Sequence, residues 1–203
     1  MLKLYYDPMS CAPASRMALE EAGADYELIH VDLKSGQQRT PEYLAVNPKG
    51  RVPALKTPEG ILTENPAIMF YVARMFPAAQ LAPLDDTWAL SRMMAFNAFL
   101  SSSVHVAFAH IGRASRWADT IEAQEAMKAK APSVVHEQFK VVDGELENGP
   151  WILGSAFSIA DIYLCNFSRA ARQYDWFTSL DRVRRHLDRM MERPSYAVVY
   201  GPS

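Results

Sequence analysis

The pattern of apolar residues changes once along this 203-residue chain, near residues 77–86, and this change strongly constrains the fold. Before it, short segments in which apolar and polar residues alternate, as in strands, are interspersed with segments whose apolar residues have helical spacing. After it, the spacing is helical throughout. The segment itself, Pro-Ala-Ala-Gln-Leu-Ala-Pro-Leu-Asp-Asp, follows neither period and is rich in proline. We therefore predict an α/β domain over residues 1–78, a linker over 79–86 and an all-helical domain over 87–203.

The first part of the chain contains a β-α-β unit. Gly23 follows the apolar helical run and marks the end of its helix. Two strands joined by such a helix pair in parallel through a right-handed crossover. The hydrophobic periodicity by itself establishes only a small α/β domain. The expected elements are strands at 2–6, 26–31, 52–56 and 60–62, and helices at 14–22, near 40–44 and at 66–76.

The second part of the chain has helical patterns at about 87–113, 120–147, 158–172 and 180–192. Pro132 falls inside the second of these, so that helix starts after the proline, kinks there or divides there. Ser158 and Asp161 have the spacing of a capping box, in which each side chain bonds to the other residue's backbone N–H. We assign Asp161 to folding, because this role needs no ligand.

Composition excludes several classes of function. The formal net charge is −2, and the arginines between 182 and 193 alternate with acidic residues, so we expect neither nucleic acid nor anionic lipid as a partner. The N-terminus lacks the apolar core of a signal peptide, and no uninterrupted apolar run approaches the ~20 residues that span a bilayer. Cys11 and Cys165 lie far apart, without histidine or cysteine neighbours at zinc-ligand spacing. We expect a cytoplasmic protein with two free thiols, no membrane contact and no metal site.

Cys11 lies between the first strand and the helix that follows it. A thiol at a helix N-terminus meets the positive end of the helix dipole, which favours the thiolate. A free cysteine is also commonly a small buried hydrophobe, and its position alone leaves both interpretations open. Ala14 stands three residues further on, so the two-thiol exchange of a Cys-x-x-Cys pair is not available.

Two further segments suggest a peptide-binding surface. Pro53 opens a strand where it cannot donate a ladder hydrogen bond, which marks an edge, a bulge or a cis bond. Asn65 precedes Pro66 at the start of a helix, where asparagine is a good N-cap. The same helix N-terminus can bind a carboxylate, and Glu64 beside it can bind an ammonium group. An α-amino acid head group presents both charges.

Three blocks of sequence together resemble the glutathione S-transferase family. They are the segment around Cys11, the run Asn-Pro-Lys-Gly-Arg-Val-Pro-Ala-Leu at 47–55 with Leu-Thr-Glu-Asn-Pro-Ala-Ile at 62–68, and the block Gly-Ser-Ala-Phe-Ser-Ile-Ala-Asp at 154–161. They span nearly the whole chain. A cysteine in the first turn resembles the bacterial beta class. The resemblance implies an α/β thioredoxin-like N-terminal domain, an all-α helical-bundle C-terminal domain and a homodimer.

The resemblance also implies an activity, the conjugation of the glutathione thiolate to small hydrophobic electrophiles, with glutathione as co-substrate and no other cofactor. Two alternatives stay open. One is glutathione-dependent thiol-disulfide exchange through a mixed disulfide on Cys11, and the other is a non-catalytic binding protein of the same fold.

Site residues follow from the resemblance, position by position. It implies catalytic roles for Cys11 and His105, with His110 as the rival histidine. The residues implied to bind glutathione are Cys11, Val52, Pro53 in cis, Glu64, Asn65, Lys34 and Lys49. The candidates for the electrophile pocket are Phe108, Trp117, Tyr163 and Phe167. The sequence departs from the family pattern at Asn65, where many members have serine, at Ala12, where relatives often have a hydroxyl, and at Val106, where some beta-class members have lysine.

Overall fold

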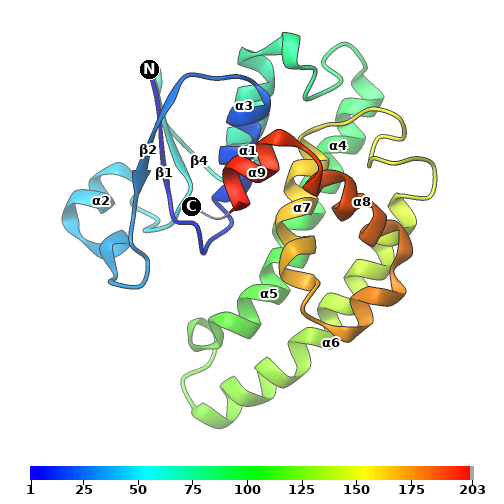
Figure 1. Ribbon diagram of the computed structural model, residues 1–203. Helices are drawn as coiled ribbons and strands as arrows, with labels where there is room; N and C mark the ends of the chain where they lie inside the picture. The colour runs from blue at the N-terminus through cyan, green and yellow to red at the C-terminus, as the bar shows by residue number, and fades with distance from the viewer. Residues whose placement is uncertain (202–203) are drawn as a thin grey trace.

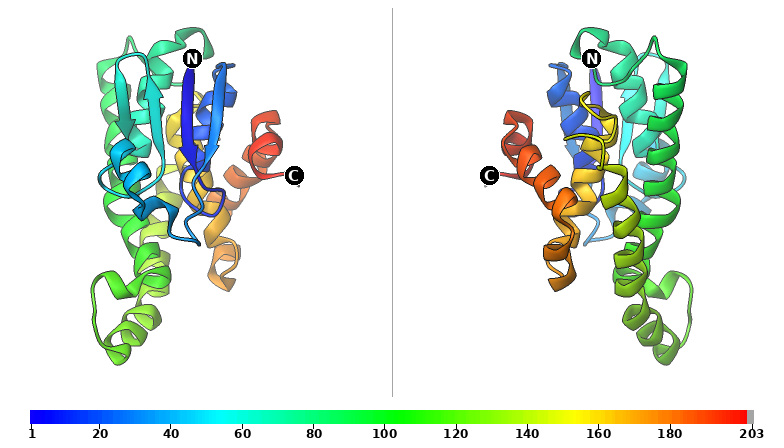
Figure 2. Two further views of the ribbon diagram at one scale, coloured as in Figure 1. Left: turned by 90° about the vertical axis from the view of Figure 1, so that its left-hand side faces the viewer. Right: turned by 90° about the vertical axis from the view of Figure 1, so that its right-hand side faces the viewer.

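The computed structural model describes residues 1–201 and consists of a small mixed sheet with its helices, followed by a helical bundle (Figure 1). This is a thioredoxin-like domain joined to an all-α domain, so the predicted fold class is confirmed. The views in Figure 2 show α5 and the start of α6 extending away from the sheet. The domain boundaries at 78 and 87 stay a prediction. Within the expected linker, Leu81 is only 1% exposed and its carbonyl accepts a hydrogen bond from the Ile159 N–H.

The sheet has the strand order β2-β1-β3-β4. Its strands are β1 (Leu2–Tyr6), β2 (Tyr26–His30), β3 (Ala54–Thr57) and β4 (Gly60–Thr63). The β1 and β2 strands are parallel, with Leu4 opposite Leu28, as the β-α-β order predicts. The β3 and β4 strands form the expected hairpin, and β3 is antiparallel to β1. Since β3 starts at Ala54, Val52 and Pro53 lie just outside the ladder.

Helices α1 (Pro13–Glu21) and α3 (Asn65–Met75) lie between the sheet and the bundle, and α2 (Pro41–Val46) lies on the opposite side (Figure 1). The α7 helix contacts both α1 and α3, so one apolar core runs through both parts of the molecule. Leu4, Met17 and Ile68 from the first part join Phe139 and Leu164 from the second in this core. The sheet and the bundle are therefore fixed relative to each other by packing.

The bundle contains α4 (Thr87–Phe99), α5 (His105–Gly112), α6 (Ile121–Glu145), α7 (Ile159–Ala171), α8 (Asp181–Met191) and α9 (Pro194–Tyr200). The single helix expected over 87–113 is interrupted by a π-helical segment, Leu100–Val104. Pro132 lies inside an unbroken α6, so of the three predicted outcomes the start after Pro132 and the division are both wrong. The α9 helix was not predicted. Short 3-10 turns occur at Gln37–Arg39, Pro77–Ala79, Ala114–Arg116 and Asp175–Ser179.

The predicted capping box at Ser158 and Asp161 is confirmed. The Asp161 carboxylate accepts hydrogen bonds from the Ser158 N–H at 2.8 Å and the Ile152 N–H at 2.9 Å. It also lies 3.1 Å from Nε2 of His186 and is fully buried. The Ser158 side chain accepts from the Asp161 N–H, as expected, and also from the Ala160 N–H at 3.2 Å. Asp161 thus joins the start of α7 to the loop before it and to α8.

Among residues 1–201, one helical stretch, Thr87–Gly112, is long and apolar enough by length and composition to cross a membrane. The sequence prediction considered only uninterrupted apolar runs, and this stretch is interrupted by polar residues such as Asn97 and His105. In the structure, α4 contacts α3 and α7, and α5 contacts α6. The stretch is therefore part of the helical bundle.

Candidate functional site

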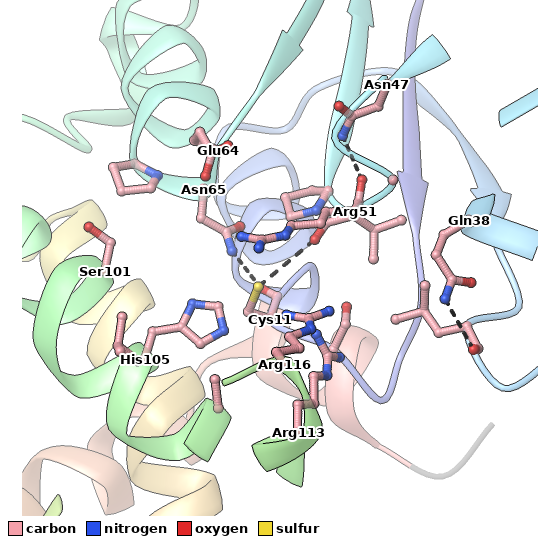
Figure 3. A pocket seen from close by; sticks show the side chains of 18 of the residues that line it. Cys11, Gln38, Asn47, Arg51, Glu64, Asn65, Ser101, His105, Arg113 and Arg116 are labelled. Atoms are coloured by element: carbon pink, nitrogen blue, oxygen red, sulfur yellow. Dashed lines mark hydrogen bonds between the residues drawn. The ribbon is translucent and has the colours of Figure 1, made fainter. Parts of the chain in front are cut away.

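A cavity of about 270 Å³ lies between the two parts of the molecule (Figure 3). One wall comes from the first domain, in the turn before α1, the loop before β3 and the start of α3. The other wall comes from α5, the turn after it and α7. Six residues implied by the resemblance as catalytic or glutathione-binding line this cavity, namely Cys11, Val52, Pro53, Glu64, Asn65 and His105.

Cys11 lies in the turn just before α1, with its Sγ 4.0 Å from the Val52 carbonyl oxygen. Burial raises the pKa of its thiol from 9.0 to about 11, and this effect outweighs the hydrogen bonds and the Arg113 charge that act in the opposite direction. Of the two interpretations that the sequence left open, the raised pKa favours the buried neutral thiol over a thiolate stabilised by the helix start. Cys11 is a neutral thiol at physiological pH and can donate a hydrogen bond.

The loop that carries Val52 is held by side chains of the first domain. The Arg51 carbonyl accepts hydrogen bonds from the Tyr43 hydroxyl at 2.7 Å and from Nδ2 of Asn47 at 2.6 Å. Gly50 has a φ of +59°, and a Cβ there would lie 3.0 Å from the Gln38 carbonyl oxygen, so glycine is favoured at this position. The Val52-Pro53 peptide bond is cis, as the resemblance implied.

Asn65 does not cap α3, contrary to one of its two expected roles. The helix begins at Asn65 itself, and Glu64 occupies the N-cap position with a φ of +74°. The Asn65 side chain is buried at 4% exposure, where its Oδ1 accepts from the Ser15 hydroxyl at 2.6 Å. Its Nδ2 donates to the Cys11 carbonyl at 2.9 Å. Asn65 therefore fixes the Cys11 turn against the start of α3.

The two lysines that the resemblance implies for the glycyl carboxylate make other contacts, and their role in binding stays a prediction. Lys49 forms an ion pair with Glu64 at 2.6 Å and a hydrogen bond to the Thr63 hydroxyl at 2.9 Å. Lys34 is exposed, and its backbone N–H donates to the Asp32 carboxylate. Neither lysine is among the residues that line the cavity.

His105 is the first residue of α5, and its ring points toward Cys11 (Figure 3). Burial lowers the pKa of His105, and the positive charges of Arg113, Arg51 and Arg116 lower it further. Its imidazole is thus neutral near pH 7 and can accept a proton. His110 instead stacks on Trp117 with ring centroids 4.2 Å apart, its Nδ1 lies 2.7 Å from the Val106 carbonyl, and it does not line the cavity. The geometry distinguishes the two histidines in favour of His105.

The four aromatic candidates separate into two pairs. Trp117 and Tyr163 line the cavity, whereas Phe108 and Phe167 do not and stack on each other at 6.1 Å. The Tyr163 side chain is only 1% exposed, and burial raises the pKa of its hydroxyl. No hydrogen bond to that hydroxyl is formed by any residue from 1 to 201.

Arginines are the main feature of the site that the sequence did not reveal. Arg51 lines the cavity from the loop before β3, and Arg113 and Arg116 line it from the turn after α5. Arg51 stands within the recognised motif, so it could have been singled out. Arg113 and Arg116 follow the end of α5, and no local pattern marks them as site residues. The part of the chain from 1 to 201 contains no cluster of three histidine, cysteine, aspartate or glutamate residues suited to a metal ion.

Comparison with known proteins is consistent with this geometry. The family models for the glutathione S-transferase N-terminal and C-terminal domains match residues 1–74 and 88–194. The glutathione S-transferase GstA of Escherichia coli O157:H7 is 34% identical over 197 residues, which cover 95% of this chain and 94% of the relative. The chain therefore belongs to the glutathione S-transferase family.

Comparison with solved structures identifies the same family. A glutathione transferase homologue from Sulfitobacter, determined with bound glutathione, superposes with a TM-score of 0.93 at 37% identity, covering 98% of this chain and 96% of that one. A bacterial beta class enzyme from Sphingomonas chungbukensis gives 0.83 at 33% identity, covering 97% and 96%. Curated relatives at 28% and 29% identity include a maleylacetoacetate isomerase and a disulfide-bond oxidoreductase, so membership alone leaves the reaction open.

Proposed function

We propose that this protein binds glutathione along the first-domain wall and transfers its thiolate to a small electrophile held by the helical wall. The observation that carries the proposal is one cavity that brings Cys11, the Val52-Pro53 loop and the start of α3 together with His105. The loop offers backbone groups to an extended peptide, as in strand addition. The start of α3 and Glu64 offer opposite charges to an amino acid head group.

In the proposed mechanism, Cys11 assists the glutathione sulfur and does not attack the substrate. A neutral thiol donates a hydrogen bond to a neighbouring thiolate and so favours that thiolate. The neutral imidazole of His105 accepts the proton that glutathione releases, and Arg113 adds a positive charge. The glutathione sulfur then forms a bond to the electrophilic carbon, and the leaving group departs with the bonding electron pair.

Thiol-disulfide exchange is the second candidate, favoured by the presence of Cys11 in the cavity itself. There the Cys11 thiolate attacks the glutathionyl sulfur of a mixed disulfide and the substrate leaves as a thiolate. A second glutathione thiolate then attacks the Cys11–glutathione disulfide, which yields glutathione disulfide and restores Cys11. A raised pKa leaves little Cys11 thiolate in the ligand-free protein, so we place this reaction second.

Cys11→Ala distinguishes the two reactions. Conjugation of 1-chloro-2,4-dinitrobenzene should fall by no more than about tenfold, since a single hydrogen bond contributes roughly 0.5–1.5 kcal/mol. Reduction of a glutathionylated peptide should be abolished. Loss of conjugation together with exchange, in a variant that still binds immobilised glutathione, would show that Cys11 is required for both reactions and does more than assist the glutathione sulfur. Failure of the folded wild-type protein to bind immobilised glutathione would exclude both reactions and support a non-catalytic binding protein.

We further propose a beta-class, cytoplasmic enzyme that forms a homodimer and needs no cofactor besides glutathione as co-substrate. The Thr87–Gly112 stretch supports the dimer, because only 28% of the residues in an apolar 18-residue window within it are buried in the single chain, and Trp88 at its start is 75% exposed. Apolar helical surface of this kind is typical of subunit contacts. Light scattering of the purified protein tests this, with twice the chain mass as the expected result.

A further inference from the structure

We infer that the electrophile is an aromatic carboxylate, whose carboxylate group is bound by Arg113 and Arg116 and whose ring lies against Trp117. This inference rests on the proposed function and names the class of its second substrate. It departs from the purely hydrophobic electrophile that the family resemblance implies.

The first observation is the convergence of like charges. Arg113 follows the last residue of α5, Arg116 lies in the 3-10 turn after it, and Arg51 lines the same cavity from the first domain. Figure 3 shows the three side chains around Cys11. Arg113, Arg51 and Arg39 each lower the pKa of Arg116, after the larger effect of burial. Such a cluster is unfavourable unless an anion joins it.

The second observation is the lack of acidic partners. Within residues 1–201, no aspartate or glutamate oxygen lies within 4.0 Å of the guanidinium groups of Arg51, Arg113 or Arg116. Other arginines and lysines in the same part of the chain form seven ion pairs at 3.1 Å or less. Glu64, the acidic residue that lines the cavity, is paired with Lys49. The three guanidinium groups are therefore free to bind an anion from solution.

The position of the arginines assigns that anion to the second substrate. The motif residues that accommodate glutathione belong to the first domain, and so does Arg51. Arg113 and Arg116 instead share the helical wall with the apolar side chains of Val106, Ala109 and Trp117. A wall that is apolar with a cationic edge fits a ligand that is apolar with an anionic edge.

Two features of this wall specify the chemistry of the ligand. Trp117 is 46% exposed and stacks on His110 with one face, which leaves an indole face for an aromatic ring. Two guanidinium groups three residues apart can each donate paired N–H groups to a planar carboxylate. The geometry thus favours a flat aromatic acid over a neutral ring.

The test compares the binding of 3,5-dinitrobenzoate and 3,5-dinitrobenzamide to the glutathione-saturated protein by isothermal titration calorimetry. These probes differ only in the charged group, and neither has a leaving group. We expect the acid to bind at least tenfold more tightly than the amide. In the Arg113→Gln/Arg116→Gln double variant the preference should fall below twofold, while Arg185→Gln, an exposed arginine on α8, keeps it. The preference should also weaken between 50 and 500 mM NaCl.

Equal binding of acid and amide to the wild-type protein would overturn the inference. A double variant that keeps the preference for the acid would also overturn it. The same holds for a double variant that keeps its fold by circular dichroism but binds glutathione tenfold more weakly, since the arginines would then hold a glutathione carboxylate. Turnover of 1-chloro-2,4-dinitrobenzene is measured in parallel. If neither this neutral substrate nor its carboxylate counterpart, 4-chloro-3,5-dinitrobenzoate, is turned over while the acid preference is intact, the proposed reaction is rejected and the anion site stands.

Discussion

The two walls of the cavity differ in how they are held. In the first domain, Asn65 is buried and bonded to Ser15 and Cys11, and the Val52 loop is fixed through Tyr43 and Asn47. In the helical domain, Arg113, Arg116 and Trp117 are exposed residues that line the cavity. Apart from the Trp117–His110 stack, no hydrogen bond or ion pair among residues 1–201 holds their side chains. A fixed wall suits a co-substrate that never changes, and a solvated wall suits a second substrate that can vary between relatives.

The largest effect we predict is a loss of stability on substitution of Asp161, the buried residue that joins the start of α7 to α8. Asp161→Ala leaves the Ser158 and Ile152 N–H groups and His186 without their buried acceptor. Removal of one partner from such a buried network costs roughly 3–5 kcal/mol. Chemical denaturation should show this loss in the free energy of unfolding. Asp181→Ala, on the exposed face of α8, should stay within about 1 kcal/mol of wild type. A similar small loss for Asp161→Ala would mean that α7 is positioned by apolar packing alone.

Next in size is the reactivity of Cys11. A pKa near 11 in place of 9.0 leaves about 100-fold less thiolate at pH 8, so iodoacetamide should alkylate Cys11 about 100-fold more slowly than a short cysteine peptide. Mass spectrometry separates Cys11 from the fully buried Cys165, which should react more slowly still. Alkylation at the peptide rate would show that the turn before α1 does stabilise a thiolate.

The same pKa shift gives a pH dependence of stability. The folded protein keeps the Cys11 proton up to about pH 11, whereas the unfolded chain releases it near pH 9.0. The folded state then binds more protons, so the free energy of unfolding falls as the pH rises from 9 to 11. The contribution of Cys11 is fully present below pH 9. Cys11→Ala should make the decline over this range shallower.

A smaller effect is predicted for the first-domain wall. Asn65→Ala removes the acceptor of the Ser15 hydroxyl and the donor to the Cys11 carbonyl, which should lower the free energy of unfolding by about 1–3 kcal/mol. The KM for glutathione should rise more than the KM for the electrophile, because the Cys11 turn loses its anchor. The exposed Asn148→Ala is the control. An unchanged KM for glutathione would show that the wall is not held by Asn65.

The smallest effect is predicted for Lys49, whose ion pair with Glu64 lies at the surface. Lys49→Gln should change the free energy of unfolding by less than about 1 kcal/mol. The KM for glutathione should change by less than threefold, as it should for Lys34→Gln, the other lysine that the resemblance suggested. A tenfold rise for Lys49→Gln alone would show that Lys49 binds the glycyl carboxylate after all.

The fold was largely predictable because its signals are local. Strand alternation, Gly23 and the Ser158–Asp161 spacing each report on neighbouring residues, and the elements they predict are present within about one or two residues. The π-helical segment and the unbroken helix through Pro132 were not predictable in this way. Both depend on how the helices pack, which compensates for the backbone hydrogen bonds that a regular helix would have made.

The site was more predictable on its first-domain side, although His105, Trp117 and Tyr163 of the helical side were also expected and do line the cavity. Cys11, Val52 and Glu64 stand in short motifs whose spacing is preserved in the sequence, so the first-domain wall could be described before the structure. Arg113 and Arg116 follow the end of a helix in an unremarkable turn. Only the tertiary arrangement brings them to the same cavity as Cys11. The spacing of residues along the sequence does not predict such contacts between remote segments.

A crystal structure of the protein with glutathione tests the central claim most directly. We predict that the glutathione sulfur lies within hydrogen-bond reach of the Cys11 thiol, with the His105 ring facing it and the peptide backbone of glutathione paired with Val52. A glutathione sulfur remote from both Cys11 and His105 would contradict the site.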